Sequence, residues 1–207
     1  PSGCGKSMFV SKIVRNYHAS FPDAPIFYIS ACDLSKDSSY NDTRQFISEI
    51  DVFKLDGPLD FNDFSVFKNS LVIFDDCDSG FSINKDAYKI VDPEMSKDEY
   101  DTLTIRKKKM IAKEASDMAA IAGTYVNNTL LSLIKNGRKY GISVMYISHK
   151  FNDGIMQMNM ISESTSIVFY PSTSNRDNLK NFMHKKLSLT KQDANKVIDM
   201  KEWYRYD

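Results

Sequence analysis

Four short apolar runs constrain the fold of this chain more than any other feature. They occupy residues 26–29, 71–74, 142–147 and 167–170. Apolar runs of this length are typical of parallel strands that are buried on both faces of a sheet. Helical patterns lie between the runs, as right-handed crossovers between parallel strands require. The sequence therefore predicts an α/β fold, with a mostly parallel sheet flanked by helices.

The intervening helices are predicted from periodicity and from capping patterns. Residues 6–21 place five apolar side chains on one stripe, and residues 129–139 form a second helical pattern. A Ser or Thr followed three residues later by an acidic residue marks three more helix starts, at Ser96, Ser174 and Thr190.

The length and composition fit one domain of ordinary size. The chain has 207 residues, of which 42% are hydrophobic and 26% are charged, so disordered and collagen-like classes are excluded. We expect residues 1–207 to form a single domain, in which the polar, Asp-rich segments 31–65 and 77–95 are loops or insertions. No apolar run is long enough to span a membrane, and three scattered cysteines indicate a reducing compartment.

Charge is distributed unevenly along the chain, although the net charge is zero. Residues 23–101 carry a net charge of −11, whereas residues 102–207 carry +8. This asymmetry predicts an acidic and a basic face, and a basic face suits a polyanionic partner. Two solvated surfaces would show the same pattern, so charge alone leaves both interpretations open.

The first seven residues, Pro-Ser-Gly-Cys-Gly-Lys-Ser, match the end of a phosphate-binding loop. The full pattern is G-x-x-x-x-G-K-[ST]. Gly5, Lys6 and Ser7 fill its last three positions, and its first glycine would lie one residue before Pro1. We therefore expect the chain to begin inside the motif, with the strand that feeds the loop upstream.

Each residue type in this loop has a chemical reason. Gly3 and Gly5 let phosphates approach the main chain, while N–H groups of the loop and of the following helix converge on the anion. Lys6 supplies a positive charge at the β- and γ-phosphates, and the Ser7 hydroxyl is a ligand for Mg²⁺. The predicted nucleotide-binding residues are Ser2, Gly3, Cys4, Gly5, Lys6 and Ser7. A glycine-rich turn that merely precedes a helix is the alternative.

The second apolar run ends in two carboxylates, which is the pattern of a Walker B strand. We expect Asp75 to hold Mg²⁺ through water and Asp76 to orient or deprotonate the attacking water. Asp78 is a further acid nearby, which we interpret as a solvated loop residue. A polar strand end in a turn is the alternative.

The third run is preceded by Arg138 and followed by Ser148 and His149. Because the carboxyl ends of parallel strands line the ligand crevice, Ser148 and His149 are candidates for sensing the γ-phosphate and positioning water. Arg138 lies at the other end of this strand, where it suits an arginine finger that reaches a neighbouring subunit's nucleotide. A structural His149 and a surface Arg138 are the alternatives.

Three segments together resemble the FtsK/HerA superfamily of P-loop motor ATPases. They are PSGCGKS at the start of the chain, LVIFDD at residues 71–76 and NGRKYGISVMYISHK at residues 136–150. The similarity covers about residues 1–170 and is greatest to the poxvirus-type genome-packaging ATPases of nucleocytoplasmic large DNA viruses. In that family an arginine precedes the strand after Walker B, as Arg138 does. A polar sensor, usually Gln, ends that strand, and His149 stands there.

This resemblance implies a RecA-like core of the ASCE type, the use of ATP and Mg²⁺, and a homo-oligomeric ring that moves double-stranded DNA into a capsid. It also implies a viral protein of the host cytoplasm or virion, or else a cytoplasmic one, with no membrane and with capsid proteins as further partners. The implied catalytic residues are Lys6, Asp76, Ser148, His149 and Arg138, and the implied metal ligands are Ser7 and Asp75.

Other functional classes remain open. An ABC-type ATPase would carry an LSGGQ-like helix before Walker B, which residues 31–70 lack, and a nucleotide kinase would need an arginine-rich lid, whereas this chain has six arginines. A non-catalytic P-loop scaffold is a third alternative. The basic run formed by residues 106–109 and Lys113 would bind DNA phosphates, or else be the solvated face of a helix.

Overall fold

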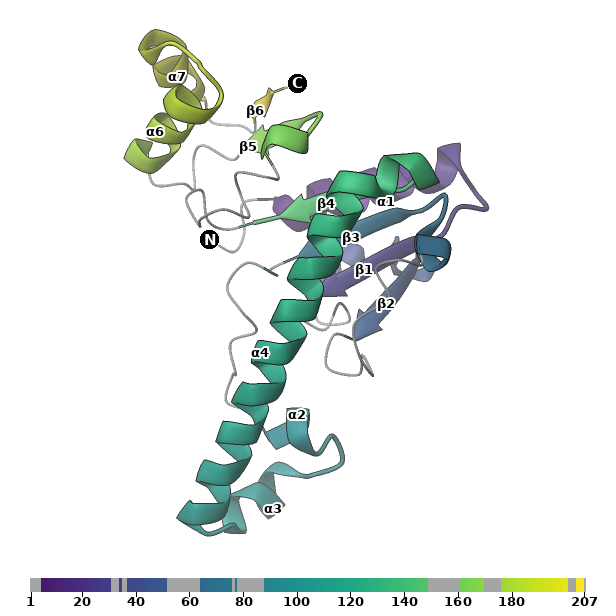
Figure 1. The fold of residues 1–207 in the computed structure, drawn as a ribbon, viewed down its shortest axis with the longest axis vertical. Coiled ribbons are helices and arrows are strands. Elements are labelled where there is room, and N and C mark those ends of the chain that lie inside the picture. Colours follow the sequence, from purple (N-terminus) through teal and green to yellow (C-terminus); the bar gives the residue numbers. More distant parts are fainter. Residues whose placement is uncertain are drawn as a thin grey trace.

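The protein has an α/β fold built on a four-stranded, all-parallel sheet (Figure 1). The computed structural model describes residues 5–30, 34, 37–51, 64–75, 77, 88–148, 161–169, 176–200 and 204–206. Helix α1 (Lys6–Ser20) packs on one face of the sheet, and helix α4 (Ile105–Asn136) packs on the other. The predicted fold class is thus confirmed at the level of a parallel sheet flanked by helices.

The strands of this sheet all end at one edge. They are β1 (Ile26–Ser30), β2 (Ile47–Asp51), β3 (Leu71–Asp75) and β4 (Ser143–Ile147), in the spatial order β2-β1-β3-β4. Ser30 pairs with Asp51 of β2 and with Asp75 of β3, and Asp75 also pairs with Ile147 of β4. We call this end of the sheet the carboxyl edge, and the opposite end the amino edge.

Sequence patterns predicted three of these strands and missed the fourth. β1, β3 and β4 coincide with apolar runs to within one residue. The prediction that residues 31–65 form only loops or insertions is wrong, because β2 lies among them and pairs with β1. The β2 sequence Ile-Ser-Glu-Ile-Asp has polar residues at three of its five positions and contains no continuous apolar run, and β2 is an edge strand of the sheet.

Helix α1 covers one face of the sheet with an apolar stripe. Val10 and Val14 are fully buried in a cluster that includes Tyr28 of β1 and Ile73 of β3. Full burial of each such aliphatic side chain contributes about 1.5–3 kcal/mol. Because alternate residues of a strand point to opposite faces, Asp75 lies on the same side of β3 as Ile73. Its carboxylate therefore belongs to the face that α1 covers.

Helix α4 packs on the other face mainly through small and aliphatic side chains. Its buried positions recur at helical spacing and include Ala119, Ala122, Val126, Leu130 and Leu133. They form one cluster with the β3 side chains that point away from α1, Val72 and Phe74. The predicted helix over residues 129–139 is wrong in its extent, because it is the end of a 32-residue helix that begins after the cap Thr104.

The amino-terminal part of α4 extends beyond the sheet and carries two short helices (Figure 1). They are α2 (Tyr88–Val91) and α3 (Lys97–Thr102). The Tyr88 and Tyr100 rings stack with centroids 4.7 Å apart, and Ser96 and Glu99 form the predicted capping box at the start of α3. Residues 77–95, which the sequence predicts to be a loop or an insertion, thus include the short helix α2.

The last described segments form a small unit with its own apolar cluster. Helices α6 (Arg176–Lys186) and α7 (Lys191–Ile198) pack around Leu179 and Met183. The fourth apolar run is a strand, β5 (Ile167–Phe169), but its assignment to the parallel sheet is wrong, because it pairs antiparallel with β6 (Tyr204–Tyr206). The predicted cap at Thr190 is confirmed by its hydrogen bond from the Asp193 N–H, whereas Ser174 lies outside the described residues.

Candidate functional site

The described part of the predicted nucleotide site comprises the start of α1 and the ends of β3 and β4. Gly5, Lys6 and Ser7 open α1, Asp75 ends β3, and Ser148 directly follows β4. Five of the predicted site residues lie outside the described residues, namely Ser2, Gly3, Cys4, Asp76 and His149.

Gly5 begins α1 in a backbone conformation that favours glycine. Its φ is +85° and its ψ is 8°, which is left-handed, and its carbonyl accepts a hydrogen bond of 2.9 Å from the Phe9 N–H. Among the described residues no side chain caps this 15-residue helix, and its first turn contains no acidic residue. The amino end of α1 thus keeps the positive end of the helix dipole, which favours an anionic ligand.

A tyrosine from the neighbouring strand holds the Asp75 carboxylate. The Tyr28 hydroxyl donates a hydrogen bond of 2.6 Å to Asp75 Oδ2. Burial, and then the negative charge of Asp75, raise the pKa of Tyr28 far above its usual value, so that the phenol stays protonated. Tyr28 is therefore a permanent donor that fixes the orientation of the carboxylate predicted to bind Mg²⁺.

A second tyrosine, Tyr40, packs against Tyr28 and lies in the neighbourhood of both Ser7 and Asp75. It ends the short helix η2 (Ser38–Tyr40), is 1% exposed, and packs edge-on against the Tyr28 ring at a centroid distance of 5.6 Å. Burial, and then the charge of Asp75, raise the pKa of Tyr40, while the Tyr28 and Ser7 side chains interact with its hydroxyl. The Tyr40 hydroxyl nevertheless forms no hydrogen bond with any described atom.

Asp37 adds a carboxylate on the Ser7 side of this cluster. It accepts a hydrogen bond of 2.9 Å from the Ser39 N–H and so caps η2. Burial opposes ionisation of Asp37, but its interactions with Ser39 and with the Ser7 hydroxyl outweigh burial and lower its pKa. Ser7 therefore lies close to an ionised carboxylate as well as to Tyr40.

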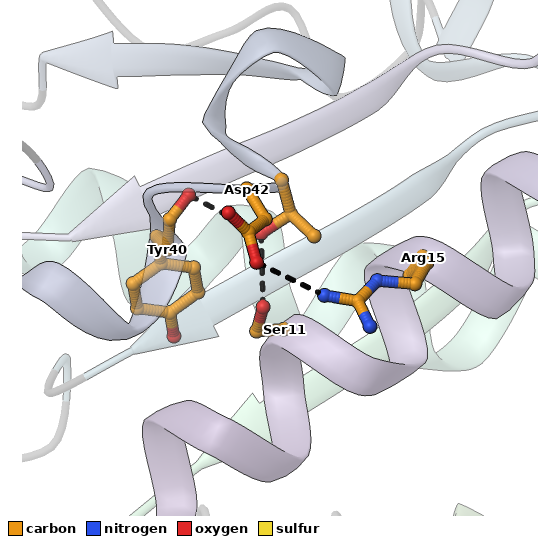
Figure 2. A network of polar contacts seen from close by, with 5 residues as sticks. Ser11, Arg15, Tyr40 and Asp42 are labelled. Atoms are coloured by element: carbon orange, nitrogen blue, oxygen red, sulfur yellow. Dashed lines mark hydrogen bonds and ion pairs between the residues drawn. The ribbon is translucent and has the colours of Figure 1, made fainter.

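Polar contacts at one-turn intervals attach residues 37–43 to α1 (Figure 2). One turn after Ser7, the buried Ser11 hydroxyl lies 3.1 Å from the Thr43 hydroxyl. A further turn along, Arg15 pairs with Asp42 at 3.4 Å, an exposed pair that contributes little stability. Thr43 also donates its N–H to the Tyr40 carbonyl. The buried Ser11–Thr43 contact therefore holds the turn that contains Tyr40 against α1.

The structure thus places Ser7 and Asp75 in the neighbourhood of the same tyrosine, although 68 residues separate them in the chain. Ser7 and Asp75 both act on Tyr40, and Asp75 is also bonded to Tyr28. Such a cluster of hydroxyl and carboxylate oxygens beside a helix amino end suits a hard cation together with an anion. Within the described ranges there is no group of three or more His, Cys, Asp and Glu side chains that suits a metal ion.

Arg138 lies away from this cluster. It belongs to the short helix η6 (Gly137–Tyr140), which precedes β4 and therefore lies at the amino edge of the sheet. The side chain is exposed, and it makes no ion pair with a described residue. Arg138 is thus at the opposite edge from Asp75, as the sequence predicted.

Sequence reasoning missed the two tyrosines and Asp37. Tyr28 lies inside an apolar run, where an aromatic residue reads as core, and Tyr40 lies in a segment that we interpreted as loop. One signal could have identified Tyr28: it precedes the end of its strand by two residues, so it faces the same side as that end. No local pattern in residues 37–43 points to Tyr40.

Comparison of the chain with protein-family models, with curated proteins and with solved structures finds no match. Among the described residues, no helix combines the length and the apolar character needed to cross a membrane. The arrangement of the site residues is therefore the basis for any proposal on function.

Proposed function

We propose that this chain is a RecA-like P-loop ATPase that binds ATP and Mg²⁺ between the start of α1 and the end of β3. One observation carries the proposal: the first part of α1 and the end of β3 meet around Tyr40, which packs against Tyr28 in one buried cluster with Val10, while Tyr28 donates its hydrogen bond to Asp75. A phosphate loop and a Walker B strand serve one nucleotide only if they meet in this way.

The topology supports the same proposal. Helix α1 begins at the carboxyl edge of a parallel sheet, where ligands of open α/β folds bind. Asp75 ends a strand that is central in that sheet, and it faces the side that α1 covers. The site is thus the junction of a helix amino end and a strand carboxyl end, as phosphate-binding α/β proteins require.

The residues of this chain have distinct roles in the proposed site. The main-chain N–H groups at the start of α1 bind phosphate, and Lys6 neutralises its charge. Ser7 and Asp75 hold Mg²⁺, which when bound supplies positive charge at the phosphate oxygens. Asp76 orients water, while Ser148, at the end of β4, and His149 sense the γ-phosphate.

We further propose that ATP hydrolysis drives double-stranded DNA through a homo-oligomeric ring, as the resemblance to viral FtsK/HerA packaging ATPases implies. Arg138 supports this proposal, because it is exposed at the amino edge of the sheet, away from the nucleotide site proposed for its own subunit. An arginine in that place suits a contact with the nucleotide of a neighbouring subunit. The amino-terminal part of α4 extends beyond the sheet (Figure 1). Its sequence carries the exposed basic residues Arg106, Lys107, Lys109 and Lys113, which offer a surface for DNA phosphates.

The test is ATP turnover by the full chain with Mg²⁺, with and without double-stranded DNA. We expect turnover that DNA stimulates less as salt rises, since phosphate contacts weaken steeply with salt. Lys6→Ala should abolish turnover, and Lys12→Ala, an exposed lysine on the same helix, should leave it unchanged. Absence of turnover would contradict the ATPase proposal, and phosphoryl transfer to a nucleoside monophosphate would favour a kinase. ATP turnover that does not respond to DNA would support the ATPase proposal and contradict the proposal of DNA translocation.

A further inference from the structure

The Tyr40 hydroxyl is a buried polar group without a hydrogen-bond partner among the described atoms. Such groups are rare in folded proteins, because an unsatisfied buried donor or acceptor loses its bonds to water without replacement. Unsatisfied groups that persist are therefore often associated with a role in binding or catalysis.

Neighbouring contacts hold Tyr40 in this unfavourable place. Asp37 caps the helix that Tyr40 ends, and the Thr43 N–H donates a bond of 2.9 Å to the Tyr40 carbonyl. The ring packs against Tyr28, and the Ser11–Thr43 contact attaches the following residues to α1. These contacts fix both the main chain and the ring of Tyr40.

The hydroxyl lies on a line of side chains that joins the two predicted metal ligands. Ser7 interacts with Tyr40, Tyr40 interacts with Tyr28, and Tyr28 donates its bond of 2.6 Å to Asp75. The line connects α1 to the end of β3 through two rigid aromatic rings. Tyr40 therefore lies in the neighbourhood of both side chains that are predicted to hold Mg²⁺.

We propose that Tyr40 and Tyr28 are positioning residues of the magnesium–nucleotide site, Tyr28 by orienting Asp75 and Tyr40 by linking Ser7 to Asp75. The Tyr40 hydroxyl, which has no hydrogen-bond partner among the described atoms, gains a hydrogen bond when Mg²⁺ and nucleotide bind together. This inference rests on the proposed ATPase function, and it assigns to two tyrosines a role that no sequence motif indicates.

The test is the Mg²⁺ dependence of ADP binding by the full chain, measured by titration calorimetry with Mg²⁺ and with EDTA. Tyr40→Phe removes only the hydroxyl. We expect it to raise the Mg²⁺ concentration for half-maximal ADP binding roughly tenfold, the equivalent of one hydrogen bond. Affinity for ADP in EDTA should not change. Tyr28→Phe should shift the Mg²⁺ midpoint in the same direction, because Asp75 loses its donor.

Stability separates this role from a merely structural one. Tyr40→Phe should keep or raise resistance to urea without ligand, because it removes an unsatisfied buried group. Tyr17→Phe, on α1 but outside the line of side chains, is the matched control and should bind Mg²⁺ and ADP as the wild type does. A wild-type Mg²⁺ midpoint in Tyr40→Phe would overturn the inference and leave the ATPase proposal standing. Failure of the wild type to bind ADP at all would overturn both.

Discussion

The Tyr28 hydroxyl donates a 2.6 Å hydrogen bond to Asp75 across two adjacent parallel strands. Tyr28 pairs in register with Ile73, so Asp75 is its diagonal neighbour two residues further along β3. The two side chains share the face that α1 covers, where the long phenol spans the diagonal. This bond fixes the carboxylate that ends β3, and it makes the stability of the sheet depend on pH.

Tyr28→Phe should flatten the fall in stability at alkaline pH. The folded-state pKa of Tyr28 is raised, so the stability linked to its proton is fully present below its unfolded value of about 10 and is lost as pH rises above it. Above about pH 10 the wild type should lose about 1.4 kcal/mol more per pH unit than Tyr28→Phe. Urea unfolding from about pH 9 to pH 11 measures the two slopes.

The matched control for the alkaline slope is Tyr140→Phe, which removes an exposed phenol. Its slope should equal that of the wild type. Equal slopes for Tyr28→Phe and the wild type would mean that Tyr28 does not retain its proton in the folded state, contrary to the bond with Asp75.

Gly141→Ala should destabilise the fold through a turn at the amino edge. Gly141 has a φ of +69°, and a Cβ there would lie 2.4 Å from the Asn69 Oδ1. We expect a loss of about 1–3 kcal/mol in the free energy of unfolding. Adding Asn69→Gly removes the obstructing side chain, so the double variant should recover the steric part of the loss. If Gly141→Ala is as stable as the wild type, then neither the positive φ of Gly141 nor its close approach to Asn69 limits the residue at this position.

Arg138→Ala should lower ATP turnover only in assembled subunits. An arginine finger acts on the neighbour's nucleotide and contributes about 10³-fold or more, whereas Lys139→Ala, an exposed neighbour in the same turn, should have little effect. Mixing Arg138→Ala subunits with Lys6→Ala subunits should restore part of the activity, because each variant supplies what the other lacks. Equal loss in isolated subunits would instead assign Arg138 to its own subunit.

Local sequence patterns predicted the central strands of the sheet. They failed for strands whose position depends on pairing with a distant part of the chain. β1, β3 and β4 are apolar throughout most of their length and were predictable, as was the amphipathic α1. β2 was missed because polar residues separate its two isoleucines, so that it shows neither an apolar run nor a regular alternation. β5 was predicted as a strand but placed in the wrong sheet, since its partner β6 lies 35 residues further along the chain, as the pairing of Phe169 with Tyr204 shows.

The candidate site was predictable only in its motif residues. Lys6, Ser7 and Asp75 belong to patterns whose chemistry is readable from residue type and spacing. Tyr40 owes its position to contacts between residues 37–43 and α1, such as the buried Ser11–Thr43 pair, and no short-range signal encodes those. A role that arises from tertiary packing in this way becomes visible only in the folded chain.

Asp76→Asn should separate ATP binding from hydrolysis. The sequence assigns Asp76 to the attacking water, so its amide should leave ATP affinity within about twofold and reduce turnover by about 10²-fold or more. Equilibrium binding and steady-state turnover on one preparation measure both quantities. Loss of both ATP binding and turnover would contradict this prediction and indicate that Asp76 helps to hold Mg²⁺.

The most direct test of the account is ATP binding by Asp75→Asn, with Mg²⁺ and with EDTA, compared with the wild type. An asparagine can still accept the Tyr28 bond, so the fold should persist while the charge that attracts the cation is lost. We predict that Mg²⁺ strengthens ATP binding by the wild type and that this gain disappears in Asp75→Asn, with affinity in EDTA unchanged. An undiminished Mg²⁺ effect in Asp75→Asn would contradict the claim that Ser7 and Asp75 hold one magnesium ion.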